Sequence, residues 1–93
     1  MNQFRINRSL SSGQIEETVR KALPCGTPIS NVERFLKQNR LIYGFDKFTS
    51  TIYTTIRRVR GSFIASKDVE IRCHFTADRK LDKLTFVVSN SFL

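Results

Sequence analysis

The chain has 93 residues, of which 40% are hydrophobic and 11% aromatic, and its 16 Lys and Arg outnumber its 8 Asp and Glu to give a formal charge of +8. This composition excludes a collagen, a low-complexity linker and a disulfide-rich scaffold, and its eight Phe residues argue against full disorder. No apolar run approaches the roughly 18 residues that a membrane-spanning helix needs, and the length predicts one domain.

The first ten residues show no clear hydrophobic period. We therefore predict a loose N-terminal arm or a short strand over residues 1–10, followed by a single domain over residues 11–93. Polar residues interrupt the first eight positions throughout, so no apolar core of a signal peptide is visible. We expect a cytoplasmic protein, and note that a mature fragment of an exported protein would begin in the same way.

A first helix is predicted from Ser11. Ser11 and Gln14 have the spacing of a capping box, in which each side chain satisfies a free backbone N–H of the other residue. The apolar residues that follow recur at helical spacing, and Pro24 with Gly26 ends the helix. These apolar residues are Ile15, Val19, Ala22 and Leu23.

A second helix is predicted over residues 30–39. Ser30 and Glu33 again have capping-box spacing, and the apolar stripe consists of Val32, Phe35 and Leu36. Because the link between the two helices is short, we predict that they form a helical hairpin.

Three strands are predicted in the second half of the chain. Residues 51–60 are rich in β-branched and aromatic side chains, and residues 69–76 and 84–89 alternate between apolar and polar. The links are too short for crossover helices, so the sheet is predicted to be an antiparallel meander. The fold class is therefore α+β, a two-layer ααβββ sandwich in which the helical hairpin packs on a three-stranded sheet. The predicted core is Ile15, Val19, Leu23, Val32, Phe35, Leu36, Ile52, Ile56, Val69, Ile71, Cys73, Phe75, Leu84, Phe86 and Val88.

The side chains with catalytic or ligand chemistry are few. Cys25 and Cys73 are far apart in sequence and form no Cys-x-x-Cys pair, so we favour two reduced, buried thiols, with a single disulfide as the alternative. His74 alternates with core residues and is predicted to lie on the exposed sheet face without a catalytic role. No phosphate-binding loop or dinucleotide fingerprint is present. We therefore predict no enzyme, no catalytic residue, no metal and no cofactor.

Two stretches resemble a known group of small modules. Residues 23–36 (LPCGTPISNVERFL) are similar to the Gly-Thr, Ser, Val and Leu pattern that begins its second helix. Residues 71–87 are similar to its "Phe-Asp, Gly-Lys-Leu, apolar strand" hairpin, with Asp78-Arg79-Lys80 in place of the glycine turn. Together they resemble the ααβββ modules of the SmpA/OmlA (BamE)-like and β-lactamase-inhibitor-protein-like group. The resemblance implies a bacterial, non-catalytic module that binds proteins, and it carries over no functional residue.

The excess of basic residues suggests two kinds of partner. The leading hypothesis is a protein-interaction module that meets an acidic protein through a basic sheet face, whose candidate residues are Tyr53, Arg57, Arg58, Arg60, Arg72 and His74. The alternative is single-stranded nucleic-acid binding by residues 43–67, where aromatic and basic residues interleave. A homodimer is a further possibility if the last strand lies at an edge of the sheet.

Overall fold

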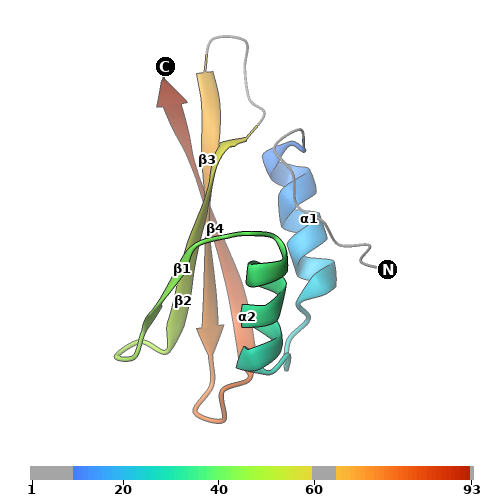
Figure 1. Cartoon of the computed structure of the whole chain (residues 1–93), viewed down its shortest axis with the longest axis vertical. Helices are drawn as coiled ribbons and strands as arrows, with labels where there is room; N and C mark the ends of the chain where they lie inside the picture. Colours follow the sequence, from blue (N-terminus) through green and yellow to red (C-terminus); the bar gives the residue numbers. More distant parts are fainter. Residues whose placement is uncertain (1–9, 60–64, 93) are drawn as a thin grey trace.

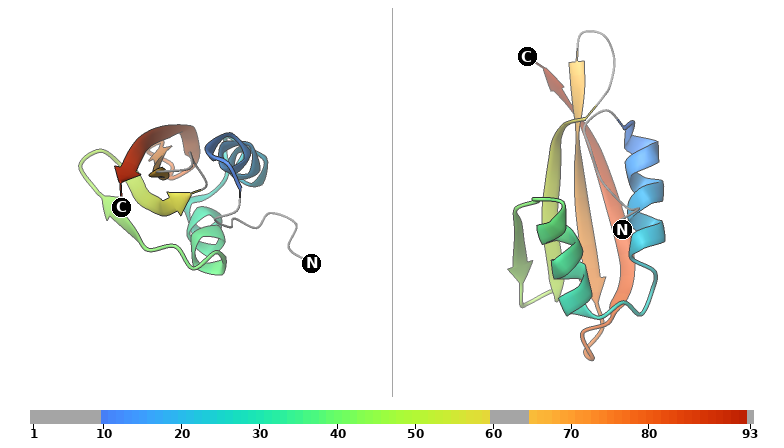
Figure 2. Two further views of the ribbon diagram at one scale, coloured as in Figure 1. Left: turned by 90° about the horizontal axis from the view of Figure 1, so that it is seen from above. Right: turned by 45° about the vertical axis from the view of Figure 1, so that its right-hand side comes forward.

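The computed structural model describes residues 10–59 and 65–92, and the side chains of residues 10–57 and 67–89. Its elements are, in chain order, α1 (Ser12–Ala22), α2 (Ile29–Gln38), β1 (Tyr43–Asp46), β2 (Thr51–Val59), β3 (Ala65–Phe75) and β4 (Leu81–Phe92). The strands form one antiparallel sheet in the order β1-β2-β3-β4, and both helices lie against the same face of it (Figures 1 and 2). The predicted α+β class is confirmed, and the sheet has one strand more than the sequence predicted.

The start of α1 matches the predicted capping box. The Ser11 hydroxyl accepts a hydrogen bond from the Gln14 backbone N–H at 3.2 Å, and the Gln14 side chain accepts one from the Ser11 N–H at 2.9 Å. The helix buries Ile15 and Val19 and ends at Ala22, two residues before Pro24.

The start of α2 differs from the prediction. The helix begins at Ile29, its N-cap is Pro28, and no side chain caps it, so the predicted capping box at Ser30 is wrong. The Ile29 N–H instead donates to the Arg79 carbonyl at 3.0 Å. That carbonyl belongs to the turn between β3 and β4, so a distant backbone group satisfies the end of the helix in place of a local side chain.

Strand β1 was not predicted from the sequence. Residues Tyr43–Asp46 pair antiparallel with Thr51–Thr54 of β2. The strand contains Gly44 and an aspartate, residue types that are depleted in strands. Its extended conformation therefore depends on the hydrogen-bonding partner that β2 provides rather than on local preference.

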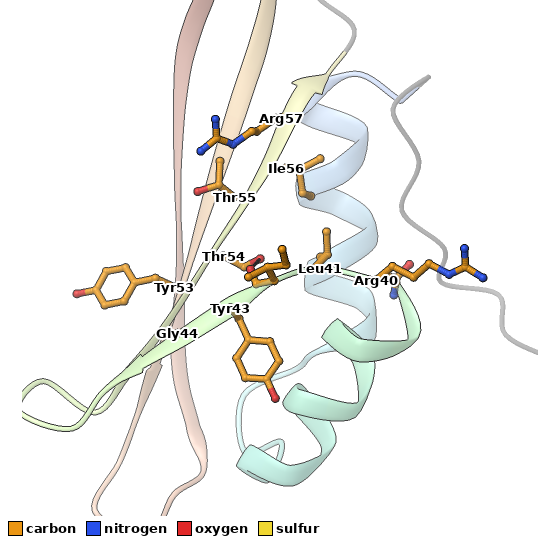
Figure 3. Close-up of a pocket in the computed structure, with 11 residues that line it drawn as sticks. Arg40, Leu41, Tyr43, Gly44, Tyr53, Thr54, Thr55, Ile56 and Arg57 are labelled. Carbon is orange, nitrogen blue, oxygen red and sulfur yellow. Dashed lines mark hydrogen bonds between the residues drawn. The ribbon is translucent and has the colours of Figure 1, made fainter.

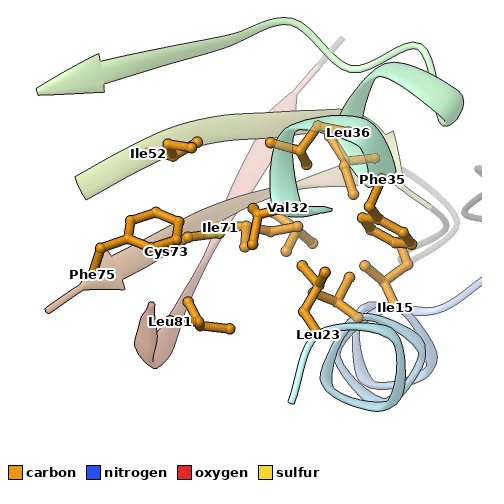
Figure 4. Packing of buried hydrophobic residues seen from close by; sticks show 13 residues of the cluster. Ile15, Leu23, Val32, Phe35, Leu36, Ile52, Ile71, Cys73, Phe75 and Leu81 are labelled. Carbon is orange, nitrogen blue, oxygen red and sulfur yellow. The ribbon is translucent and has the colours of Figure 1, made fainter. Parts of the chain in front are cut away.

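The core lies between the helices and the sheet (Figure 4). Twelve of the fifteen predicted core residues are buried, namely Ile15, Val19, Leu23, Val32, Phe35, Leu36, Ile52, Ile56, Val69, Ile71, Cys73 and Phe75. Leu84 and Phe86 are partly buried against this cluster. Val88 is 46% exposed, so its place in the predicted core is wrong, and Leu81, only 2% exposed, was missed.

A bulge explains the missed leucine. His74 pairs with Lys83, whereas the next residue of β3, Phe75, pairs with Leu81, so that Asp82 is an extra residue in β4. The bulge shifts the alternation by one position. Leu81 therefore reaches the core although it is out of step with Leu84.

The two cysteines are free thiols, as favoured from the sequence, but only Cys73 is buried. Cys25 is exposed and its thiol donates to the Asp82 carbonyl at 3.2 Å, so the predicted burial of Cys25 is wrong.

The predicted N-terminal arm falls, apart from Leu10, outside the described residues. Within the described ranges, no helix has the length and apolar character needed to cross a membrane.

Candidate functional site

The sheet face opposite the helices carries most of the predicted binding residues. Tyr53, Thr55 and Arg57 of β2 point away from the helices (Figure 3). Tyr53 pairs with Arg72, and the neighbouring row joins Thr51, His74 and Lys83. The structure therefore brings Tyr53, Arg57, Arg72 and His74 to one surface, which we call the open face. The side chain of Arg58 and all of Arg60 lie outside the described residues.

Arg72 is paired on this face. Its Nη2 and Nε atoms lie 2.9 and 3.0 Å from Oε1 of Glu70. Its guanidinium carbon also lies 5.8 Å from the centre of the Tyr53 ring, a cation–π distance. Arg72 is therefore held between a carboxylate and a ring, and its charge is largely compensated within the protein.

The charge of the open face is mixed rather than uniformly basic. Among its described side chains, the register and alternation place three cations and three carboxylates there. The cations are Arg57, Arg72 and Lys83, and the carboxylates are Asp46, Asp68 and Glu70. This face alone does not concentrate the net positive charge of the chain.

His74 is half-buried between two threonine hydroxyls. The Thr51 hydroxyl gives its hydrogen to the Thr49 carbonyl at 3.0 Å, so it can only accept from His74 Nδ1, 3.3 Å away. In the neutral ring, Nε2 then accepts from the Thr85 hydroxyl at 3.0 Å. Partial burial lowers the pKa of His74 below its ordinary value, and the nearby Lys83 and Arg72 charges lower that pKa further while Asp82 opposes them. Partial burial and the two nearby cations thus favour a neutral imidazole, and the two hydrogen bonds can form with that ring.

One edge of β2 is only partly covered. β1 pairs with Thr51–Thr54, and in the described part of the chain no strand pairs with the outer edge of Thr55–Val59. The link from α2 to β1 passes beside this stretch, and a groove of about 780 Å³ lies between them (Figure 3). We call it the β2-edge groove. It is lined by Asn39, Arg40, Leu41, Ile42, Tyr43, Gly44, Tyr53, Thr54, Thr55, Ile56 and Arg57.

The β2-edge groove combines positive charge with exposed apolar surface. Arg57 points to the open face and Arg40 points away from it, toward the helix side (Figure 3). The residues described as lining the groove include no acidic one. Ile42, at its wall, is 92% exposed, and its carbonyl accepts a hydrogen bond from the Thr54 hydroxyl at 2.8 Å. The groove therefore presents an anion-attracting, partly apolar surface beside an unpaired strand edge.

Sequence reasoning found Tyr53 and Arg57 of this groove but missed Arg40 and Ile42. These two residues become neighbours of β2 only because β1 forms, and β1 itself has no clear sequence signal. The mixed charge of the open face was visible in the sequence, because Asp68 and Glu70 share the alternation of Arg72.

No group of three or more His, Cys, Asp or Glu side chains suited to a metal ion occurs among residues whose positions are described. No family model, curated protein or solved structure matches the chain. The resemblance to BamE-like and β-lactamase-inhibitor-protein-like modules remains a prediction from the residues that carry it.

Proposed function

We propose that the protein is a non-enzymatic interaction module that binds an acidic, extended segment of a partner protein in the β2-edge groove. The observation that carries this proposal is the edge of Thr55–Val59, with which no described strand pairs, beside a groove whose described lining contains no acidic residue. An unpaired strand edge offers backbone N–H and C=O groups to a further strand, and this is a common way of recognising extended peptides.

Charge supports an acidic partner. Arg40 and Arg57 border the groove on two sides, and the chain as a whole carries a formal charge of +8. Opposite charges increase the rate of encounter and disfavour basic competitors. Both side chains are exposed, and Arg57 makes the stronger candidate contact because it lies on β2 itself.

Apolar contacts supply the second part of the recognition. Side chains of an added strand alternate between the two faces of the sheet. On one face they would meet Tyr53 and Thr55, and near the helix side they would meet Leu41 and the exposed Ile42. The partner segment is therefore expected to alternate acidic and β-branched residues.

The test uses a fluorescent peptide of alternating Glu and Val, with a Lys and Val peptide of the same length as its counterpart. We expect the acidic peptide to bind more tightly, and Arg57→Glu to weaken its binding about tenfold or more. Arg34→Glu, an exposed position of α2 outside the groove, is the matched control for net charge. Equal losses of affinity for the acidic peptide in the two variants would show that only overall charge matters and would refute binding in the β2-edge groove.

Amide hydrogen exchange tests the mode of binding. Strand addition is expected to protect amides of Thr55–Val59 when the acidic peptide is bound, while amides of β4 keep their exchange rates. Protection confined to the open-face residues of β3 would place the partner on the sheet face and not at its edge.

A second candidate is single-stranded nucleic-acid binding, and Phe48 favours it. This ring is 90% exposed, and Lys47 Nζ lies 5.7 Å from its centre, a pairing suited to a stacked base and its phosphate. The open face carries as many described carboxylates as described Lys and Arg side chains and offers phosphates no net attraction, so we rank this candidate second. Labelled single-stranded RNA and DNA should then bind at low salt, bind less at high salt, and lose affinity in Phe48→Ala. Binding that is absent at low salt would exclude it.

A further inference from the structure

Within the described residues, most of the outer edge of β4 is unpaired. β4 is the last strand of the sheet, and the link between the helices hydrogen-bonds to the beginning of its outer edge. The Gly26 N–H donates to the Leu81 carbonyl, the Leu81 N–H donates to the Thr27 carbonyl, both at 2.8 Å, and the Cys25 thiol donates to Asp82. From Lys83 onward, no other strand of the described chain pairs with this edge.

This uncovered stretch lacks the features that usually protect an edge strand. Natural edge strands are blunted by charges, proline or a bulge. After Lys83, β4 reads LTFVVSNSF, without a charged residue or a proline, and the bulge in the pairing of β4 with β3 precedes this stretch, at Asp82. Val87 and Val88, at its middle, are 40% and 46% exposed. In the part of the chain that the structure describes, this edge is therefore unpaired, uncharged and long enough to accept another strand.

We propose that two copies of the chain pair antiparallel through β4, forming a twofold-symmetric dimer with one continuous sheet of four strands from each copy. The register starts at the covered end of the strand. The helix link occupies the edge as far as Asp82, so the free stretch runs from Lys83 to Phe92. We place the axis at Val87, which pairs Lys83 with Ser91 and leaves Phe92, the last residue of the strand, outside the pairing. Val87 of one copy then faces Val87 of the other at the symmetry axis.

This register gives compatible neighbours on both faces of the sheet. Thr85 of one copy pairs with Ser89 of the other on the open face, and Phe86 of one copy pairs with Val88 of the other on the helix face. Phe86 is partly buried under Arg20, whose guanidinium carbon lies 5.0 Å from the ring centre. Because β4 moves away from α1 toward its C-terminal end (Figure 1), Val88 is left 46% exposed. Phe86 of the second copy would cover more of it.

The lack of charge along this stretch favours a second copy as the occupant of the edge. In a twofold antiparallel pair only the residue on the axis faces its own counterpart, and that residue, Val87, is uncharged. Here Lys83 would face Ser91, and every other residue of the stretch is uncharged. An acidic partner would find its cations in the β2-edge groove, at the other side of the sheet. The dimer is thus independent of the proposed function, and either can fail without the other.

Sedimentation equilibrium of the full chain over a wide range of concentrations tests the dimer. We expect a monomer–dimer equilibrium without larger species, because a twofold interface closes on itself. Val87→Lys, which places two ammonium groups at the axis, is expected to raise the dimer dissociation constant by at least about tenfold. Phe48→Lys, at an exposed site in the turn between β1 and β2, is the matched control and should leave the constant unchanged.

A cross-linking experiment tests the register independently. Facing residues of antiparallel strands have Cα atoms about 4.5–5.5 Å apart, within the range of a disulfide. Cys25→Ser/Val87→Cys should therefore form a disulfide-linked dimer under mild oxidation, whereas Cys25→Ser/Thr55→Cys should not. A monomer at every concentration, larger assemblies, an unchanged dissociation constant in Val87→Lys, or equal cross-linking of the two cysteine variants would each overturn the proposal.

Discussion

The backbone N–H of Ile29 donates a 3.0 Å hydrogen bond to the carbonyl of Arg79, so the first turn of α2 is held by the turn that joins β3 to β4. Pro28 forms an isolated bridge with Lys80 beside this bond. The beginning of the second helix is thus tied to the end of the longest hairpin, and its stability depends on residues far along the chain.

The two helix starts are expected to respond differently to the same substitution. Ser11→Ala removes a side-chain cap and should lower the free energy of unfolding by about 1 kcal/mol. Ser30→Ala, inside the first turn of a helix that no side chain caps, should change it by less than about 0.5 kcal/mol. Urea denaturation measures both. A larger loss at Ser30 than at Ser11 would contradict the observed starts.

A substitution to glycine is expected to have opposite effects at two arginines. Arg40 follows α2 with a φ of 58°, and the Leu41 N–H next to it donates to the Leu36 carbonyl at 2.9 Å, which is the pattern of a Schellman motif. Because glycine avoids the left-handed penalty, Arg40→Gly should stabilise the fold by about 1 kcal/mol. Arg34→Gly, in the exposed middle of α2, should destabilise it by about 1 kcal/mol. Melting temperatures that shift in the same direction in the two glycine variants would refute this prediction.

The titration of His74 should reveal its cationic neighbours. We expect NMR to give a pKa below the ordinary value of 6.5, since partial burial, Lys83 and Arg72 all disfavour the imidazolium. Lys83→Gln should raise that pKa, whereas Lys37→Gln, on an exposed part of α2, should leave it unchanged.

The lowered pKa of His74 also predicts how the free energy of unfolding changes with pH. Because the pKa of His74 is lower in the folded state, its contribution is fully present above pH 6.5 and is lost as the pH falls from there through the folded pKa. A His74→Gln variant should lack this part of the pH dependence. A stability of the natural chain that rises relative to the variant on acidification would contradict the assignment.

The buried thiol of Cys73 predicts a loss of stability at alkaline pH. Burial raises its pKa from 9.0 to about 12, so between these values the unfolded chain releases a proton that the folded chain retains. The free energy of unfolding should therefore fall with pH, by at most about 1.4 kcal/mol per pH unit for this group. The Cys73→Ala variant should lose this part of the decrease in unfolding free energy with pH. Parallel curves of unfolding free energy against pH for the variant and the natural chain would contradict the prediction.

The helices and the long strands were predictable because each has a strong local signal. Ile15 and Val19 recur at helical spacing, and Ile71 and Cys73 alternate with polar residues, so burial follows directly from the pattern. Strand β1 was not predictable in this way, since Tyr43–Asp46 is short and becomes extended only beside β2. The exposure of Val88 was missed for a related reason, because alternation predicts a face but not where the covering helix ends.

The candidate site was predictable only in part. Tyr53 and Arg57 follow from the alternation of β2, but the groove beside them depends on β1 being shorter than β2, a feature of pairing and not of composition. The ion pair between Arg72 and Glu70 was likewise hidden. Both residues were recognisable as neighbours on one face, but the sequence did not reveal how much charge remains for a partner.

The reciprocal hydrogen bonds that join Leu81 to Gly26 and Thr27 have a consequence for how the chain reaches its final form. During synthesis both helices emerge long before Leu81, and domains generally fold as units as they leave the ribosome. A nascent chain that ends before this leucine lacks the contacts that fix the link between its helices. The last hairpin therefore supplies the backbone partners that hold the segment between the first two elements in place.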